Sequence, residues 1–369
     1  MKQRIMISLA PFFLSSCLTA YAGSQLKQEP VLHHNDLPIN YVEPSSQVIL
    51  KTEEKIKDLF NLQYDNEYTI QKIGTQTYWI GVQYYNATVI INDEGVLVID
   101  PLGPDSAKAL FNAITSITDK PITAIIYSHY HLDHIGGTNT LIALNNKKYP
   151  NNAKHHIRII ANKQINDNIK QYASLSNNGS RIPKVPLPTE TFSKSMKTIH
   201  FGKQQLILKR LKGAGHTKDN TLILLPEERV IHFADMINPD QLPFYNFAGA
   251  EHFPHGYIRD LNYLVSDKFS TKWDFINGGH GNIGTKTDIQ KLLDYIHDLT
   301  KATKEALNSA DYPTNKADGN HFIWFKHWQN TITKQVKERL RNKYSHMYGF
   351  DAGVVESHAA MVLNELMDH

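Results

Sequence analysis

The chain has 369 residues, of which 41% are hydrophobic and 20% are charged. These fractions are typical of soluble globular proteins and do not fit a chain that is disordered throughout. At roughly 150 residues per domain, the length allows two domains or one large α/β domain with additions. The formal net charge is +3 with basic and acidic residues intermixed, which gives no electrostatic case for a nucleic acid or an anionic membrane as the partner. We therefore expect a small-molecule substrate.

Residues 1–22 have the layout of a secretory signal peptide. Lys2 and Arg4 precede an apolar run over residues 5–14, and small residues then lead to the sequence Ala-Tyr-Ala at 20–22. The apolar run is shorter than the roughly 20 residues that a permanent transmembrane helix needs. We therefore predict an exported protein, periplasmic or secreted, without a stable membrane span.

Cys17 gives the N-terminus a second interpretation, because Leu-Ser-Ser-Cys at 14–17 resembles the bacterial lipobox, whose cysteine carries a lipid anchor. Cys17 is also the only cysteine of the chain. An internal disulfide and a thiolate ligand or nucleophile are therefore excluded. Any metal site must be built from histidine and carboxylate side chains.

The order of the expected elements predicts a layered α/β domain. Residues 23–65 are polar and rich in proline, and we expect a partly ordered lead-in with one short helix near residues 51–60. Short β-rich runs follow, as in an antiparallel meander, at residues 77–82, 88–91 and 96–99. We then expect a helix at 105–117 and a buried strand at 122–127. Strand, helix and strand in this order are typical of a layered fold.

The second half of the chain predicts another set of strands and then a helical tail. Helices are expected at 138–144 and 163–172, a strand at 157–161, and a loop or flap at 174–190. Further strands are expected at 197–200, 205–211, 221–225 and 230–234, and long amphipathic helices at 286–309, 324–342 and 354–367. We predict a catalytic domain over residues 66–300 with two sheets that share a core, and a C-terminal helical extension over 301–369.

Four good metal ligands lie within six residues directly after the expected buried strand, in the sequence His129-Tyr130-His131-Leu132-Asp133-His134. His129 and His131 are two residues apart, and in extended backbone this spacing places both imidazoles on the same side. They can therefore bind one ion. Asp133 and His134 follow as the chain turns into a helix, and they can face a second ion. Hydrolytic sites with two metals hold their ions about 3.5–4 Å apart.

Three more candidate ligands lie far along the chain, and each follows a β-like run. They are His216, Asp235 and His280. Small residues flank each position and let the backbone turn sharply toward an ion. One edge of a sheet can therefore collect all of these side chains.

These motifs, together with Asp100 after the run at 96–99, resemble the five motifs of the metallo-β-lactamase superfamily over about residues 68–300. The resemblance implies a four-layer αββα sandwich with the site at the sheet edge. It divides the ligands into two sets that share a bridging carboxylate: His129, His131 and His216 for the first metal, Asp133, His134 and His280 for the second, and Asp235 between them. Asp100 would orient a ligand from behind.

A water molecule between two divalent ions ionises near neutral pH, which predicts a metal-activated hydroxide as the nucleophile. Zinc is the expected metal, and iron and manganese are compatible with the same ligands. Asp133 is also the predicted catalytic residue. We expect a small ester, lactone, thioester, or sulfate or phosphate ester as the substrate.

Asp235 decides between branches of the family that the chain resembles. Metallo-β-lactamases usually carry cysteine or serine at this position, whereas an aspartate is typical of the glyoxalase II-like dinuclear branch. Cleavage of a β-lactam is therefore the alternative substrate reaction. Two further alternatives are an iron-dependent redox enzyme similar to the persulfide dioxygenases of this fold and a non-catalytic metal-binding protein. The complete second ligand set, including His134 and His280, favours hydrolysis.

The loop after Asp235 is dense in aromatic residues and is the candidate substrate wall. Its predicted substrate-binding residues are Phe244, Tyr245, His252 and His255. The alternative is that these side chains pack the loop onto the helical tail.

Overall fold

The computed structural model describes residues 39–59, 66–151, 156–173, 184–250, 253–310 and 320–368. The predicted signal peptide, Cys17, His252 and most of the predicted flap at 174–190 lie outside these residues.

Among the described residues, eight strands form the first sheet, in the order β10-β9-β8-β7-β6-β5-β4-β2. Its strands are β2 (Ile49–Leu50), β4 (Thr69–Lys72), β5 (Thr77–Val82), β6 (Tyr85–Asn92), β7 (Gly95–Ile99), β8 (Ile122–Ile126), β9 (Arg158–Asn162) and β10 (Glu190–Phe192). Strands β4 to β7 are an antiparallel meander, as predicted, and β7 to β10 run parallel.

Five strands of the described chain form the second sheet, in the order β11-β12-β13-β14-β15. They are β11 (Met196–Phe201), β12 (Gln204–Arg210), β13 (Thr221–Leu225), β14 (Val230–His232) and β15 (Phe275–Asn277). The first four are antiparallel, and β15 joins β14 in parallel.

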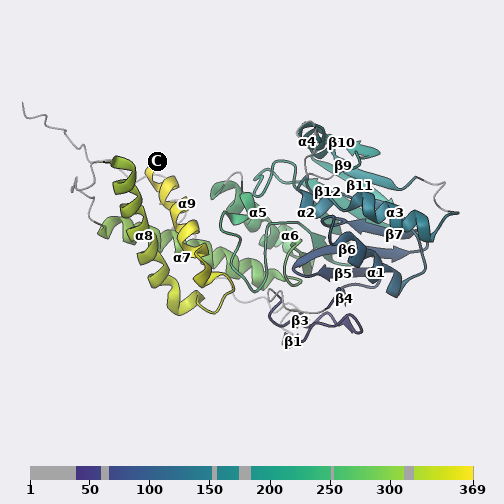
Figure 1. Ribbon diagram of the computed structural model, residues 1–369, viewed down its shortest axis with the longest axis horizontal. Helices are drawn as coiled ribbons and strands as arrows, with labels where there is room; N and C mark the ends of the chain where they lie inside the picture. Colours follow the sequence, from purple (N-terminus) through teal and green to yellow (C-terminus); the bar gives the residue numbers. More distant parts are fainter. Residues whose placement is uncertain are drawn as a thin grey trace, which may run out of the picture. The chain divides into compact units, whose positions relative to one another are not determined.

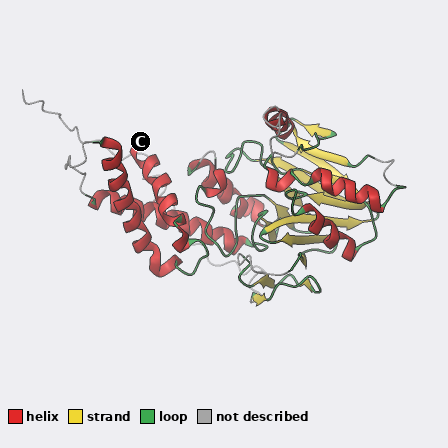
Figure 2. Cartoon of the chain, in the orientation of Figure 1, coloured by secondary structure: helices red, strands yellow, loops and turns green. Residues whose placement is uncertain are grey.

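Strands β7, β8 and β13 are buried on both faces of their sheets, which explains why they are almost entirely apolar. In β7, Val96 and Val98 pack toward helices while Leu97 and Ile99 face the other sheet. The helices over the first sheet are α1 (Ala107–Ile117), α3 (Thr138–Lys148) and α4 (Lys163–Ala173). Those over the second are α5 (His255–Val265), α6 (Asp267–Ser270) and α7 (Lys286–Ser309). The predicted αββα sandwich is therefore confirmed, as Figures 1 and 2 show.

The C-terminal helices continue the core of the second sheet. Helix α7 packs against α8 (His321–Tyr344), and α9 (Val354–Asp368) packs against both, after the short turn η3 (Phe350–Ala352). Their apolar side chains belong to the same cluster as those of β13, β14 and α5. The predicted boundary between residues 300 and 301 falls inside α7, so the extension shares a helix with the catalytic domain.

The predicted helix near residues 51–60 is wrong, because β3 (Glu54–Ile56) lies there, with turns on either side of it. Strand β3 pairs with β1 (Asn40–Val42). The buried Lys55 ammonium lies 3.2 Å from a carboxylate oxygen of Asp288 and 3.4 Å from one of Asp240. A buried lysine needs such partners, so this distant ion-pair network fixes the segment as strand against its local preference.

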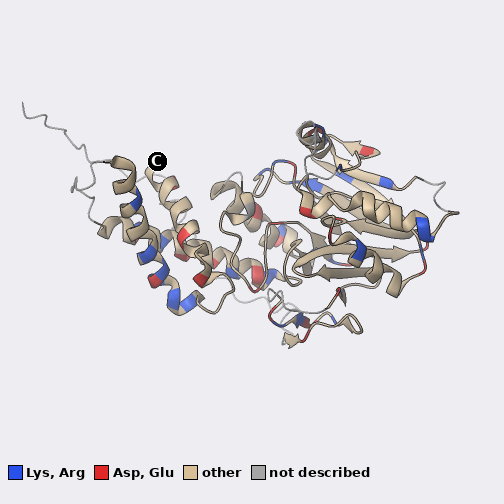
Figure 3. Ribbon diagram, in the orientation of Figure 1, with Lys and Arg blue, Asp and Glu red and all other residues tan. Residues whose placement is uncertain are grey.

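Charged residues are distributed without segregation by sign. In Figure 3, Lys and Arg (blue) and Asp and Glu (red) are interspersed over the described helices, strands and loops. Within those residues, no helix combines the length and the apolar character that crossing a membrane requires.

Candidate metal centre

The predicted ligands come together where strands of both sheets end. His129 follows β8, Asp235 follows β14 and His280 follows β15, while His216 lies in the loop before β13. The short helix α2 (Leu132–Ile135) carries Asp133 and His134. Carboxyl ends of neighbouring strands thus gather residues that are about 150 positions apart in sequence at one edge.

The first set, His129, His131 and His216, surrounds one carboxylate oxygen of Asp235. Asp235 Oδ2 lies 3.3 Å from His129 Nε2, 3.1 Å from His216 Nε2 and 4.0 Å from His131 Nδ1. These four ligand atoms all lie within 4.8 Å of one another. They define one position that three imidazoles and a carboxylate can share.

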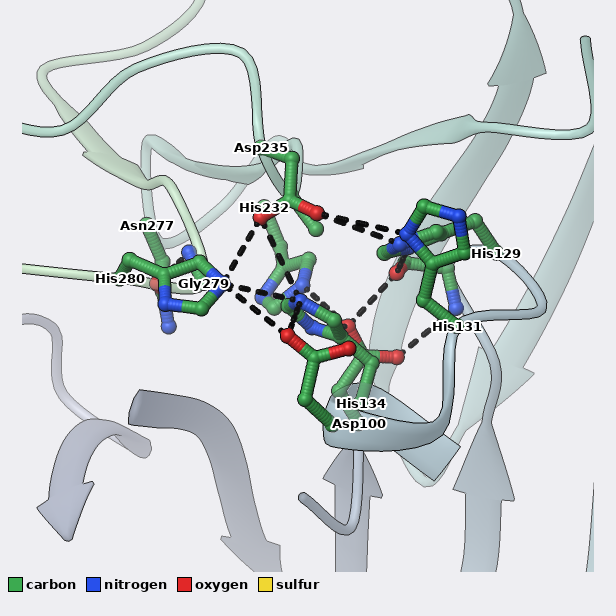
Figure 4. A network of polar contacts seen from close by, with 12 residues as sticks. Asp100, His129, His131, His134, His232, Asp235, Asn277, Gly279 and His280 are labelled. Atoms are coloured by element: carbon green, nitrogen blue, oxygen red, sulfur yellow. Dashed lines mark hydrogen bonds and ion pairs between the residues drawn. The ribbon is translucent and has the colours of Figure 1, made fainter. Parts of the chain in front are cut away.

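The second set, Asp133, His134 and His280, faces the other oxygen of the same carboxylate. Asp235 Oδ1 lies 3.0 Å from His280 Nε2 and 3.4 Å from His134 Nε2. Asp133 Oδ2 is 3.5 Å from His280 Nε2. Figure 4 shows Asp235 between the two sets, with one oxygen turned toward each.

The residues fit two divalent cations. Ring nitrogens face each other across each position, with His131 Nδ1 3.2 Å from His216 Nε2 and His134 Nε2 3.3 Å from His280 Nε2. Among the residues that the structure describes, the buried atoms His129 Nε2 and Asp235 Oδ1 have no hydrogen-bond partner. Buried polar atoms in proteins are almost always satisfied, so these two call for a ligand. Histidine nitrogens with carboxylate oxygens suit zinc and also admit iron or manganese.

The first set is poised to bind a cation at neutral pH. Burial, and after it the neighbouring imidazoles, lower the pKa of His129 to about 3 and that of His131 to about 4. Both rings are therefore neutral near pH 7 and present a lone pair. In the second set, burial alone lowers the pKa of His134 and His280, but the Asp235 and Asp133 carboxylates raise it above the ordinary value.

Two aspartates at strand ends have an unusual backbone conformation, with positive φ. Asp100 has φ +62° and Asp235 has φ +63°, a left-handed conformation that costs a non-glycine residue on the order of 1–3 kcal/mol. Backbone hydrogen bonds maintain it, from Asp235 N–H to Gly278 O at 2.8 Å and from Asp100 N–H to Ile126 O at 3.0 Å. The turn at Asp235 aims its carboxylate between the two sets.

Gly279 allows the His280 loop to approach the first motif. A Cβ on Gly279 would lie 2.6 Å from His134 Cε1, and its φ is +78°. A side chain there would push the two histidines of the second set apart. The glycine beside His280 therefore allows the His280 loop to lie close to His134.

Asp100, His129 and His134 also offer ligand atoms within 4.8 Å of one another, but hydrogen bonds already engage both oxygens of Asp100. Its Oδ1 accepts from Ser128 N–H at 2.8 Å, and its Oδ2 accepts from the Ser128 hydroxyl and from ring nitrogens of His134 and His232. Burial alone raises the pKa of Asp100, but the hydrogen bonds from the two histidines lower it well below the ordinary value. The ionised carboxylate keeps a proton on His134 Nδ1, which leaves Nε2 free to face the cation position.

The family follows from this arrangement and from one comparison. The family model described as the metallo-beta-lactamase superfamily matches residues 80–307. The chain belongs to this superfamily.

Relatives within the superfamily differ in the reactions that their names describe. The chain is 21% identical over 286 residues to the 2,4-dinitroanisole O-demethylase subunit beta of Nocardioides sp. (strain JS1661), covering 77% of each protein. It is 25% identical over 181 residues to the linear primary-alkylsulfatase of Pseudomonas sp. (strain ATCC 19151), covering 41% of this chain and 33% of that enzyme. The solved stereoselective inverting sec-alkylsulfatase from Pseudomonas sp. superposes with TM-score 0.52 at 16% identity, over 80% of this chain and 50% of that one. The chain thus spans half or less of both alkylsulfatases.

Sequence reasoning missed a buried chain of hydrogen bonds that supports the superfamily's site. His232 lies between the sheets, with Nε2 3.0 Å from Asp100 Oδ2 and Nδ1 3.1 Å from Thr88 Oγ1. Asn277 donates to Thr88 Oγ1 at 2.9 Å and accepts from Gly279 N–H at 2.8 Å. A histidine inside the apolar strand β14 was the signal available in the sequence. The chain links Asp100 to the loop that carries His280.

Asp260 is a second missed residue, and it supports the loop before His216. Its carboxylate accepts from Gly213 N–H at 2.9 Å and from Gly215 N–H at 3.0 Å. Asp260 belongs to α5, a helix that the sequence did not predict, and only the fold brings it to this loop.

The structure separates the predicted substrate-binding residues. The Phe244 ring lies 5.4 Å from the His280 ring and is 38% exposed, so it borders the site. Tyr245 is 63% exposed. His255 begins α5 and pairs with Glu365 at 3.3 Å, so it is not brought into the centre.

Tyrosines that the sequence did not assign to the substrate also border the histidines. Tyr85 lies 5.1 Å from the ring of His280 and Tyr84 lies 6.2 Å from it. On the opposite side, the Tyr130 ring contacts His131 at 4.6 Å and stacks on Tyr172 at 5.0 Å. Aromatic rings therefore flank both sets.

Proposed function

We propose that the chain is a dinuclear metal-dependent hydrolase that cleaves a small ester, lactone, thioester, or sulfate or phosphate ester. The observation that carries the proposal is the Asp235 carboxylate, whose two oxygens each face a separate histidine set. An aspartate at this position, in place of a cysteine or serine, favours ester-type substrates over β-lactams. The alkylsulfatase relative supports the inclusion of sulfate esters, and the O-demethylase relative adds an aryl methyl ether to the candidates.

The residues divide the work of such a reaction. When bound, the two metal ions would lower the pKa of a water molecule and polarise the bond to be cleaved. Asp100 fixes the ring of His134, and Ser128 Oγ, 2.9 Å from His129 Nδ1, fixes the ring of His129. Nε2 of each histidine then faces the Asp235 carboxylate and the candidate metal positions.

Asp133 is the residue that we assign to proton transfer. Its side chain is 39% exposed, while Oδ2 lies within 3.7 Å of His134 Nε2. Burial alone raises the pKa of Asp133, but His134 and His280 lower it below its ordinary value. The carboxylate is therefore ionised and accessible, and it can accept a proton from water and deliver it to the leaving group.

We also propose that the chain is exported. Lys2, Arg4, the apolar run at 5–14 and the small residues before Gly23 support cleavage by signal peptidase, and Cys17 supports lipidation as the alternative. The mass and N-terminal sequence of the mature protein from a cell envelope fraction test this. A start at Gly23 or a lipid on Cys17 supports export, and an intact Met1 in the cytosol contradicts it.

A substrate panel tests the hydrolase proposal. Purified mature protein is loaded with Zn²⁺, Fe²⁺ or Mn²⁺ and offered 4-nitrophenyl acetate, a γ-lactone, dodecyl sulfate, 4-nitrophenyl phosphate, 2,4-dinitroanisole and a chromogenic cephalosporin. We expect metal-dependent turnover of an ester-type substrate, lost on chelation. Turnover of the cephalosporin alone would replace the proposal with β-lactam hydrolysis. Oxygen uptake on a persulfide by the iron form, without hydrolysis, would replace it with the redox alternative.

A further inference from the structure

One uncharged segment lies beside both histidine sets of the metal centre. The wall segment, residues 244–249, includes the turn η2 (Phe247–Gly249). At its start, the Phe244 ring meets the His280 ring edge to face at 5.4 Å. At its end, a Cβ on Gly249 would lie 3.9 Å from His216 Cε1. The segment therefore runs from the second histidine set to the first.

The chemistry of the wall segment is apolar and aromatic. Its sequence, Phe-Tyr-Asn-Phe-Ala-Gly, contains no charged residue. Phe244, beside His280, is 38% exposed, and the neighbouring Tyr245 is 63% exposed. An exposed aromatic surface of this kind fits an alkyl or aryl group better than a charged one.

Helix α9 holds the wall segment from behind through His358. His358 is fully buried, and its Nε2 lies 2.7 Å from the carbonyl oxygen of Phe244. Its Nδ1 lies 2.9 Å from the hydroxyl of Tyr295 on α7. Burial lowers the pKa of His358 to about 4, so the ring is neutral near pH 7. Nε2–H therefore donates to Phe244, and Nδ1 accepts from Tyr295.

The middle of the wall segment rests on the same histidine. The Phe247 ring packs against the His358 ring with centroids 4.0 Å apart. The Phe247 N–H also donates to the Phe244 carbonyl at 2.7 Å, so this oxygen accepts two hydrogen bonds. Just before the segment, Leu242 N–H donates to the Tyr348 carbonyl at 3.1 Å. The C-terminal chain thus anchors the segment at several points.

We propose that α9, through His358, positions the wall segment as the surface against which the alkyl or aryl part of the substrate packs. His358 is a positioning residue, because it acts through Phe244 and Phe247. The proposal has two parts. The substrate side, that the wall segment packs against the substrate, rests on the proposed hydrolase function. The mechanical side, that His358 positions the wall segment, does not.

Hydrogen–deuterium exchange tests the mechanical side on the full chain without substrate. His358→Leu removes the donor, His358→Gln retains one near the Nε2 position, and His327→Ala changes an exposed histidine of α8 as a control. We expect amides of residues 242–250 to exchange about tenfold faster in His358→Leu, as the loss of one hydrogen bond predicts. His358→Gln should return most of the protection, and His327→Ala should leave it unchanged.

Kinetics on homologous probes test the substrate side. The probe pairs are 4-nitrophenyl acetate with 4-nitrophenyl octanoate, or hexyl sulfate with dodecyl sulfate. His358→Leu should raise KM about tenfold for the probe with the longer chain. KM for the shorter probe, and kcat for both probes, should stay within about twofold of the wild type. Metal content should equal that of the wild type. His358→Gln should restore the chain-length preference.

Several outcomes overturn the proposal. Unchanged amide exchange at residues 242–250 in His358→Leu would show that His358 does not position the wall segment. Equal losses of kcat on all probes, together with a lower Tm, would show that His358 has a merely structural role. If His358→Leu does not fold, Tyr295→Phe removes only the hydroxyl on Nδ1 and should show the same changes at smaller size. A wild type that cleaves no probe refutes the proposed function, while the exchange result still decides the role of His358.

Discussion

The two histidine sets share Asp235 but are held in different ways. The first set is supported by Ser128, which bonds to both His129 and Asp100, and by Asp260 of α5, which bonds to the loop before His216. The second set depends on a hydrogen-bond chain that crosses the space between the sheets, from Asp100 to the loop of His280.

The sets also differ in electrostatics. Burial and neighbouring imidazoles lower the pKa values of His129 and His131, whereas carboxylates raise those of His134 and His280. The second position is also richer in negative charge, because Asp133 lies beside it in addition to Asp235. The difference teaches that one shared carboxylate can join two positions with different supports, because Asp100 bonds to His134 directly but reaches His129 only through Ser128. Damage to Asp100 should therefore affect the second position more than the first.

Replacing the shared residue should have the largest effect. Asp235→Ala removes an oxygen from each position, and we expect kcat/KM to fall by more than about 10³-fold, beyond the 10–100-fold typical of an outer partner. Asp93→Ala, at an exposed carboxylate, is the control. Activity within tenfold of the wild type would show that Asp235 does not bridge.

Asp100→Asn should have the next largest effect and should sharpen the comparison. The amide keeps the size of the side chain but loses the negative charge that orders His134 and His232, so we expect a loss of about 10–100-fold in metal affinity. Titrations of both ions should place the larger loss at the second position. An equal loss at both would break the distinction between the supports.

His358 lies outside both sets and should give the smallest effect, on stability. Its folded pKa of about 4 lies below the ordinary value of 6.5, so between these values the unfolded chain binds more protons and acid favours unfolding. Between pH 7 and 5.5, the wild type should lose on the order of 1 kcal/mol of unfolding free energy relative to His358→Gln. Denaturant titrations at both pH values measure this, and parallel curves for the two proteins would contradict it.

The sequence predicted the fold, and the residues that the structure gathers in the candidate metal centre, for a physical reason. His129 to His134 follow an apolar run that only a buried strand explains, and small residues beside His216 and His280 mark turns at strand ends. These signals are local. The αββα layers likewise follow from the order and apolar character of the strands.

Features that depend on distant partners were missed. His232 is an ordinary histidine until the fold places it beside Asp100, and Asp260 acts only because α5 reaches the loop before His216. The segment near Lys55 forms strand through its ion pair with Asp288, 233 residues away. The role of His358 likewise depends on the contact between α9 and Phe244.

Metal occupancy tests the central claim most directly. Metal per chain is measured by elemental analysis on the wild type, His216→Ala and His280→Ala after reconstitution with zinc. Two positions with separate histidine ligands predict about two ions in the wild type and about one in each variant. One ion per chain in the wild type, unchanged by His280→Ala, would contradict a dinuclear centre.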